Sequence, residues 1–200
     1  MERREEERHP SGVSAMDEAL GGGFPMRAIS EVVAPERSCG ASLLLHRLLR
    51  TARIKNSYVA IVDADDRFAP EMVEEEDDLA YCYWVRCRGV EEALVVGDIL
   101  SSDENFGLLL IDLCGASASA LTRIPGNRWF RLQRAVRKHG LTCVVFTPVP
   151  TVSAATVRLR LLNRFCLADI TGDVDALAET FSFEWMRTGR SQRLEELRSA

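Results

Sequence analysis

The stretch Ala34-Pro-Glu-Arg-Ser-Cys-Gly-Ala-Ser42 is the key to this chain, because it lies between a predicted strand and a predicted helix. Ile29 to Val33 before it is an apolar run of strand length, and Leu43 to Leu49 after it is an apolar run typical of a helix. A phosphate-binding loop, with the pattern Gly-x-x-x-x-Gly-Lys-Ser/Thr, connects a strand to a helix in the same way. The stretch therefore stands at the place of a phosphate loop.

The stretch lacks the lysine on which such a loop depends, since that lysine reaches the β and γ phosphates. Without a gap, the first glycine, second glycine, lysine and hydroxyl positions hold Ala34, Cys39, Gly40 and Ala41. Shifted by one residue, Gly40 is the second glycine, Ala41 replaces the lysine and Ser42 supplies the hydroxyl. The residues between the glycine positions are Pro35, Glu36, Arg37 and Ser38. We therefore expect no ATP hydrolysis, no catalytic residue, no metal and no cofactor, while weak residual ATP binding stays open.

Composition indicates a single globular domain, since 200 residues with 46% hydrophobic and 28% charged content are ordinary for a folded chain. A net charge of −5 argues against a broadly basic, nucleic-acid-binding surface. The sequence has neither a membrane-spanning apolar run nor an apolar secretion segment, so we expect a cytoplasmic protein without membrane contact. The six cysteines form no Cys-x-x-Cys pair and are expected to be reduced, buried and structural.

Strand-like and helix-like runs alternate along most of the chain. The strand-like runs are residues 29–33, 58–62, 81–86, 108–112 and 141–146, and the helix-like runs are residues 43–49, 90–100 and 127–139. This alternation predicts an α/β fold with a mostly parallel central sheet flanked by helices.

The two ends of the chain and its acidic segment depart from this alternation. The runs Val157–Leu161 and Phe181–Trp185 alternate apolar and polar residues, which predicts half-exposed antiparallel strands near the C-terminus. We expect a charged flexible tail over residues 1–10, one domain over 11–190 and a polar tail over 191–200. The acidic segment Glu71–Asp78 is expected to be solvated.

The order of these motifs resembles the core of the RecA/RAD51-like superfamily, over roughly residues 11–190. Leu109-Leu-Ile-Asp112 is an apolar strand ending in an acid, as at the family's Walker B position. Ile61-Val-Asp-Ala-Asp65 is similar to the strand that carries the family's catalytic glutamate, with Asp65 at a vestigial catalytic-acid position. The resemblance implies a degenerate RecA-like domain without ATP chemistry. Asp112 is equally interpreted as an aspartate that anchors a loop.

The loss of the phosphate-loop residues is similar to that in two branches of this group, ImuA and SulA. ImuA-type chains share the glycine-rich stretch seen here from Gly21 to Glu31, and their likeness implies a non-catalytic adaptor in the DNA-damage response, in translesion synthesis or recombinational repair. The implied partners are RecA and an ImuB-like polymerase homologue, with DNA contacted weakly or indirectly and self-association open. The alternatives are a SulA-like division inhibitor that binds FtsZ, a weak nucleotide-binding recombination accessory, and a weak hydrolase using Asp65 and Asp112.

A basic cluster is the remaining candidate site, as a surface for DNA or a partner. Its residues are Arg128, Arg131, Arg134, Arg137 and Lys138. The alternative is an amphipathic helix that buries Trp129, Leu132 and Val136 and leaves its arginines in water. Arginine at every third position drifts around a helix instead of keeping to one face.

Overall fold

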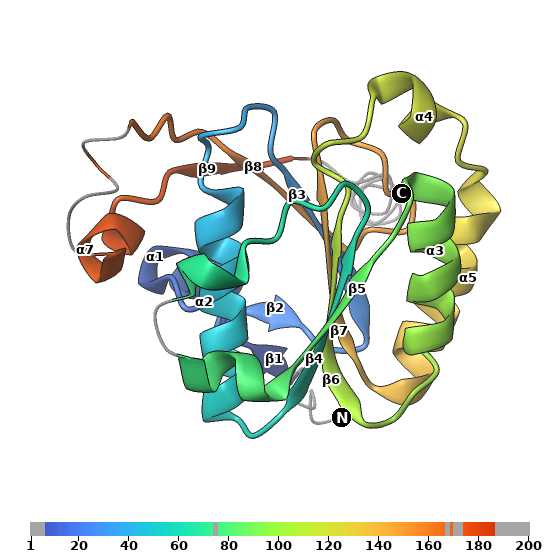
Figure 1. Cartoon of the computed structure of the whole chain (residues 1–200), viewed down its shortest axis with the longest axis horizontal. Helices are drawn as coiled ribbons and strands as arrows, with labels where there is room; N and C mark the ends of the chain where they lie inside the picture. Colours follow the sequence, from blue (N-terminus) through green and yellow to red (C-terminus); the bar gives the residue numbers. More distant parts are fainter. Residues whose placement is uncertain (1–6, 74–75, 167–168, 170–173, 187–200) are drawn as a thin grey trace, which may run out of the picture.

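The fold is built on a seven-stranded sheet that is parallel except at one edge (Figure 1). The computed structural model describes residues 7–73, 76–166, 169 and 174–186. In spatial order the strands are β5 (Cys82–Arg86), β4 (Tyr58–Asp63), β6 (Phe106–Asp112), β7 (Thr142–Thr147), β3 (Ala28–Val33), β8 (Val157–Leu161) and β9 (Phe183–Trp185). The predicted α/β fold with a mostly parallel central sheet is confirmed.

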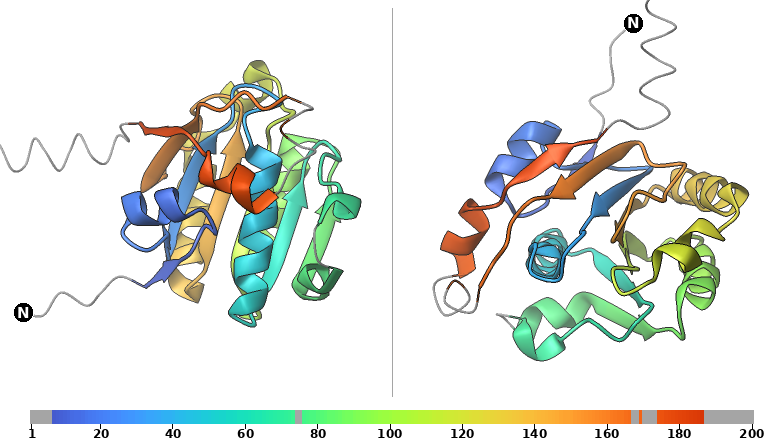
Figure 2. Two further views of the ribbon diagram at one scale, coloured as in Figure 1. Left: turned by 90° about the vertical axis from the view of Figure 1, so that its left-hand side faces the viewer. Right: turned by 90° about the horizontal axis from the view of Figure 1, so that it is seen from above.

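Helices cover both faces of the sheet, as strands that are apolar throughout require. On one face lie α1 (Ser14–Leu20), α2 (Ala41–Ile54) and α7 (Val174–Glu179) (Figure 1). On the other face lie α3 (Val90–Leu100) and α5 (Gly126–His139), and Figure 2 shows the same three layers from two further sides. The short elements are α4 (Ala118–Thr122) and the 3₁₀ turns η1 (Pro70–Met72) and η2 (Glu76–Tyr81).

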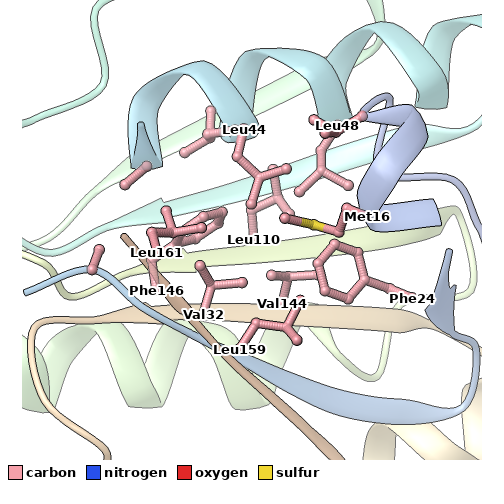
Figure 3. Packing of buried hydrophobic residues seen from close by; sticks show 14 of the residues in the cluster. Met16, Phe24, Val32, Leu44, Leu48, Leu110, Val144, Phe146, Leu159 and Leu161 are labelled. Atoms are coloured by element: carbon pink, nitrogen blue, oxygen red, sulfur yellow. The ribbon is translucent and has the colours of Figure 1, made fainter. Parts of the chain in front are cut away.

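Each face of the sheet has its own hydrophobic core. In the first core, Leu44 and Leu48 of α2 pack with Met16 and Phe24 onto Leu110 and its neighbours (Figure 3). The second core contains the three apolar side chains predicted to be buried by α5, which are Trp129, Leu132 and Val136. Full burial of side chains of this size contributes about 1.5–3 kcal/mol each, so the two cores account for the cohesion of the layers.

Parallel pairing brings the carboxyl ends of the strands to one edge of the sheet. Val33 at the end of β3 is in register with Thr147 of β7, and Asp63 at the end of β4 is in register with Asp112 of β6. The loops that follow β3, β4 and β6 therefore lie beside one another. The degenerate phosphate loop and Asp65 lie in these loops, and Asp112 directly precedes one of them.

The C-terminal strands pair in two different ways. β9 is antiparallel to β8, as predicted, but β8 also pairs with β3 in parallel. Val157, Leu159 and Leu161 of β8 are buried while Arg160 is exposed. The alternating pattern therefore reports the one buried face of β8 correctly, and it carries no information on the direction of the neighbouring strand.

The predicted boundary of the N-terminal tail at residue 10 is wrong. Arg8–His9 form a short strand, β1, antiparallel to β2 (Phe24–Pro25), and the amide of Met26 donates to the carbonyl of Glu7 at 3.0 Å. His9 is buried because its ring packs against α2, where its Nε2 lies 3.2 Å from the Thr51 hydroxyl. Residues 1–6 and the predicted tail 191–200 lie outside the described residues.

The acidic segment and the cysteines differ in part from what composition predicts. Asp78 is buried and forms an ion pair with Arg53 of α2, so the segment Glu71–Asp78 is not solvated throughout. Cys39 and Cys143 are buried as expected, whereas Cys166 is exposed. Within the described ranges, no helix is both long and apolar enough to cross a membrane.

Stability should fall as the pH drops from about 6.5 towards 4. Burial, with Lys55 nearby, lowers the pKa of His9 to about 4, so below its usual pKa the unfolded chain binds a proton that the folded chain refuses. The resulting loss in the free energy of unfolding amounts to at most roughly 3 kcal/mol. Urea unfolding of the wild type and of His9→Asn at pH 7.5 and 5 checks this. His46, whose burial lowers its pKa too, remains in both proteins, so identical pH dependence of the two would contradict the assignment to His9.

Candidate site at the carboxyl edge of the sheet

The stretch Ala34–Ser42 forms the loop between β3 and α2, where a phosphate loop would lie. The amide of Ala34 donates to the carbonyl of Thr147 at 2.7 Å, and Gly40 precedes the first turn of α2 with a φ of 96°. Beside the loop is a polar cavity of about 150 Å³. Its lining consists of Ala34, Pro35, Glu36, Arg37, Ala41, Arg67, Cys114 and Gly115.

The space beside Gly40, which holds the lysine position in the gap-free alignment, is filled by two aromatic rings. A Cβ atom on Gly40 would lie 2.9 Å from Cε2 of Phe165 and 2.9 Å from Cζ of Phe181. The two rings contact each other edge to face, with centroids 6.1 Å apart. Because 2.9 Å is shorter than any ordinary carbon contact, a side chain at this position would have to displace the rings.

The chain segment that carries Phe165 is fastened to the loop by polar contacts. The amide of Phe165 donates to the carbonyl of Ser38 at 2.9 Å. Arg164 pairs with Glu36 at 2.8 Å through Nη2 and Oε1. The segment after β8 therefore covers the loop at residues 36–40. In the shifted alignment Ala41 stands at the lysine position, is buried and carries no charge.

Asp112, the Walker B-like residue, is held by its surroundings. Its carboxylate accepts the amide of Cys114 at 2.8 Å and lies 3.8 Å from Nε of Arg67. Burial raises the pKa of Asp112, and the Cys114 amide and the Arg67 charge act against that increase. These contacts are those of an aspartate that anchors the loop after its own strand.

Asp65, at the vestigial catalytic-acid position, lies against the loop after β6. A Cβ on Gly115 would lie only 2.7 Å from Oδ2 of Asp65, so the glycine is what allows this approach. Partial burial and the charge of Asp63 raise the pKa of the Asp65 carboxyl. The parallel register thus brings Asp65 to the same edge as Asp112. Among the described residues, no group of three or more His, Cys, Asp or Glu side chains could hold a metal ion.

Sequence reasoning missed Asp63, which organises the loop after β4. Its fully buried carboxylate accepts the amides of Arg67 and Phe68 at 2.9 Å and the indole N–H of Trp84 at 3.2 Å. These bonds fix the turn that presents Arg67 to the cavity and places Asp65 against Gly115. The signal in the sequence was an acid at the end of an otherwise apolar strand.

Sequence reasoning also missed Glu31, a fully buried acid in the middle of β3. Its carboxylate accepts the Thr147 hydroxyl at 2.9 Å and the amides of Thr151 and Val152 at 2.6 and 3.1 Å, and it forms an ion pair with Arg158. The short segment between β7 and β8 is therefore tied to the neighbouring strand. A lone charge inside an apolar strand was the available signal.

The residues of the predicted basic cluster differ in their contacts. Arg131 forms an ion pair with Asp98 of α3, and Nη1 of Arg128 is buried. Arg131, Arg134, Arg137 and Lys138 are exposed. Four of the five residues are therefore exposed, and one of those four is paired with a neighbouring helix.

The fold and this edge are consistent with one class of protein, the RecA-like α/β cores. The chain is similar to the protein RecA of Mycoplasmopsis pulmonis, with 30% identity over 108 residues that cover 53% of this chain and 32% of that protein. It is likewise 31% identical to RecA of a Nocardioides species over 109 residues, which cover 54% of this chain and 31% of the relative. The chain thus spans about a third of the length of these relatives. No family model matches it.

Replacing Gly40 by alanine should lower the free energy of unfolding by about 1–3 kcal/mol, because the methyl group meets the two rings. The matched control is Gly140→Ala, since Gly140 has a similar φ of 84° but only one atom within 4 Å, at 3.8 Å. Urea unfolding of both variants measures the difference, and Phe165→Ala should reduce the effect of Gly40→Ala. Equal destabilisation at the two glycines would mean that the rings do not crowd Gly40.

Proposed function

We propose that this protein is a non-catalytic RecA-like adaptor in the DNA-damage response, acting by binding other proteins. The observation that carries the proposal is the loop Ala34–Ser42, which lies where RecA-like cores bind phosphate but has Phe165 and Phe181 packed on Gly40. The partial similarity to several RecA proteins supports the connection to recombination and repair.

The loop lacks what phosphoryl transfer needs. That reaction depends on positioning the nucleotide and neutralising its charge, mainly through the lysine and a bound Mg²⁺. Here the lysine position of the gap-free alignment is Gly40, and its space is filled from within the chain. Asp112, the acid at the Walker B-like position, is buried beside Arg67. These features favour a RecA-like scaffold that keeps the central sheet and does not catalyse phosphoryl transfer.

The segment between β7 and β8 supports binding of proteins over a direct grip on DNA. The resemblance implies a long DNA-gripping loop at this point, but only residues 148–156 separate the two strands. Glu31 and Arg158 hold this short segment from inside the sheet. A segment held in this way is poorly suited to following the backbone of a DNA strand.

Within this proposal the favoured partners are RecA and an ImuB-like polymerase homologue. The support is the glycine-rich stretch from Gly21 to Glu31, which resembles ImuA-type chains. Gly23 is required by the fold, since a Cβ there would lie 2.1 Å from the carbonyl oxygen of His9. FtsZ, the partner expected of a SulA-like inhibitor, is the competing outcome of the partner experiment below.

The purified protein should show no DNA-stimulated ATP hydrolysis above the protein-free rate. Gly40→Lys combined with Ala41→Thr should not create activity, because the two rings occupy the space of the new lysine. A coupled ATPase assay with and without single-stranded DNA measures this, with an active RecA as positive control. Robust hydrolysis that disappears in Asp112→Ala would contradict the non-catalytic assignment.

Affinity capture of the tagged protein from ultraviolet-irradiated host cells should recover RecA or a polymerase-like protein, identified by mass spectrometry. Deletion of the gene should in parallel lower the frequency of damage-induced mutations or the survival after irradiation. A mock-tagged strain and unirradiated cells are the controls. Recovery of FtsZ without any repair protein, together with unchanged mutation frequency and survival, would reject the proposal.

A further inference from the structure

The outer side of α5 is a charged surface whose role the site at the sheet edge does not explain. Residues 126–139 contain five arginines and lysines and no aspartate or glutamate, in a chain whose net charge is −5. Trp129, Leu132 and Val136 of this helix are buried in the second core. The remaining side chains face a neighbouring element or water.

The contacts of these side chains separate them into two groups. Arg128 has a buried nitrogen, and Arg131, although exposed, is engaged in an ion pair with Asp98 of α3. Phe130, Arg134 and Arg137 follow one another at spacings of four and three residues, so they share one exposed side of the helix. Phe130 is 55% exposed, which is unusual for a side chain of its size in a solvated helix. We call Phe130, Arg134, Arg137 and the adjacent Lys138 the α5 strip.

The α5 strip is presented on a firmly attached helix. Oε1 of Gln133 accepts the amide of Ile29 at 2.9 Å, and Nε2 of Gln133 donates to the carbonyl of Arg27 at 3.1 Å. The guanidinium of Arg27 in turn donates to the carbonyl of Arg137 at 3.1 Å, which adds a further cation beside the strip. A packed helix fixes the backbone positions of these side chains before binding, so only their rotamer freedom is lost, which favours their use as a recognition surface.

We propose that the α5 strip binds a short acidic amphipathic segment of a protein partner. An apolar side chain of that segment packs on the ring of Phe130, and two of its carboxylates pair with Arg134 and Arg137. Guanidinium groups bind carboxylates through paired hydrogen bonds, and exposed aromatic and arginine side chains are the residue types that carry most binding energy at protein interfaces. The proposal rests on the adaptor function above, because that function requires a protein partner.

The charges around the α5 strip favour a protein segment over a nucleic acid. Phe130 and Lys138 are eight residues apart, so the strip is only about 12 Å long. Acidic side chains border it, with Asp98 next to Arg131 and Glu104 3.4 Å from His139. Duplex DNA carries one negative charge for about every 1.7 Å of its axis, so its phosphates would extend past the strip towards those carboxylates.

Photocrosslinking tests the proposal. The probe is the full chain with benzoylphenylalanine in place of Phe130, irradiated in damaged host cells, and the control carries the same group at exposed Tyr83 on the far strand β5. Mass spectrometry should identify a partner peptide that contains aspartate or glutamate near the crosslink. Recovery of that partner by affinity capture should fall at least tenfold with Arg134→Glu, whereas Arg88→Glu, a reversal at another exposed arginine, should leave it unchanged. Thermal unfolding verifies that each variant is folded.

A charge-swap experiment then identifies the contact. Replacing the acidic residue nearest the crosslink in the partner by lysine should restore binding to Arg134→Glu and weaken binding to the wild type. Undiminished capture of the partner by Arg134→Glu, without a crosslink at position 130, would overturn the α5 strip and leave the adaptor function standing. A crosslink to nucleic acid, or to a peptide without acidic residues, also overturns it. Failure to capture any protein with the wild type would count against both proposals.

Discussion

Two fully buried carboxylates hold the carboxyl edge of the sheet in place. Glu31 is satisfied by the Arg158 guanidinium, by one hydroxyl and by two amides, and Asp63 is satisfied by the amides of its own loop and by the Trp84 indole. A carboxylate in the interior costs several kcal/mol unless such donors surround it. The amide donors belong to loops, while Arg158, Thr147 and Trp84 belong to neighbouring strands, so each carboxylate connects a loop to the sheet.

This arrangement explains how the edge is ordered without a nucleotide. In a working phosphate loop, backbone amides and a lysine wrap around an anion and the anion in turn fixes the loop. Here the corresponding loop is covered by Phe165 and Phe181 and connected to the segment after β8 by Arg164 and Glu36. The first core reaches this loop, since Ala34 and Ala41 belong to it and also line the cavity. The loop is therefore held from within the chain, by the first core and by the segment after β8.

The sequence was informative where a residue pattern reflects burial, and silent where the decisive contacts join distant segments. Strands buried on both faces are continuous apolar runs, so β3, β4, β6 and β7 were predicted almost to their ends, and α3 and α5 followed from their spacing. The parallel register accounts for Asp65 and Asp112 reaching the same edge. Nothing local indicated that Phe165 would pack on Gly40, or which loop Glu31 would bind, because these contacts depend on the finished sheet. The two-residue strand β1 was missed since its charged surroundings resemble a tail.

The arginines of α5 show how a three-residue spacing places similar side chains in different environments. A step of three residues turns about 60° short of a full circle on an α-helix, so successive arginines rotate steadily around the axis. Arg128 thereby reaches the interior side and Arg131 meets Asp98, which fastens α5 to α3. The next two steps bring Arg134 and Arg137 to the side where Phe130 is exposed. The same three-residue period therefore attaches one part of α5 to α3 and leaves Arg134 and Arg137 exposed.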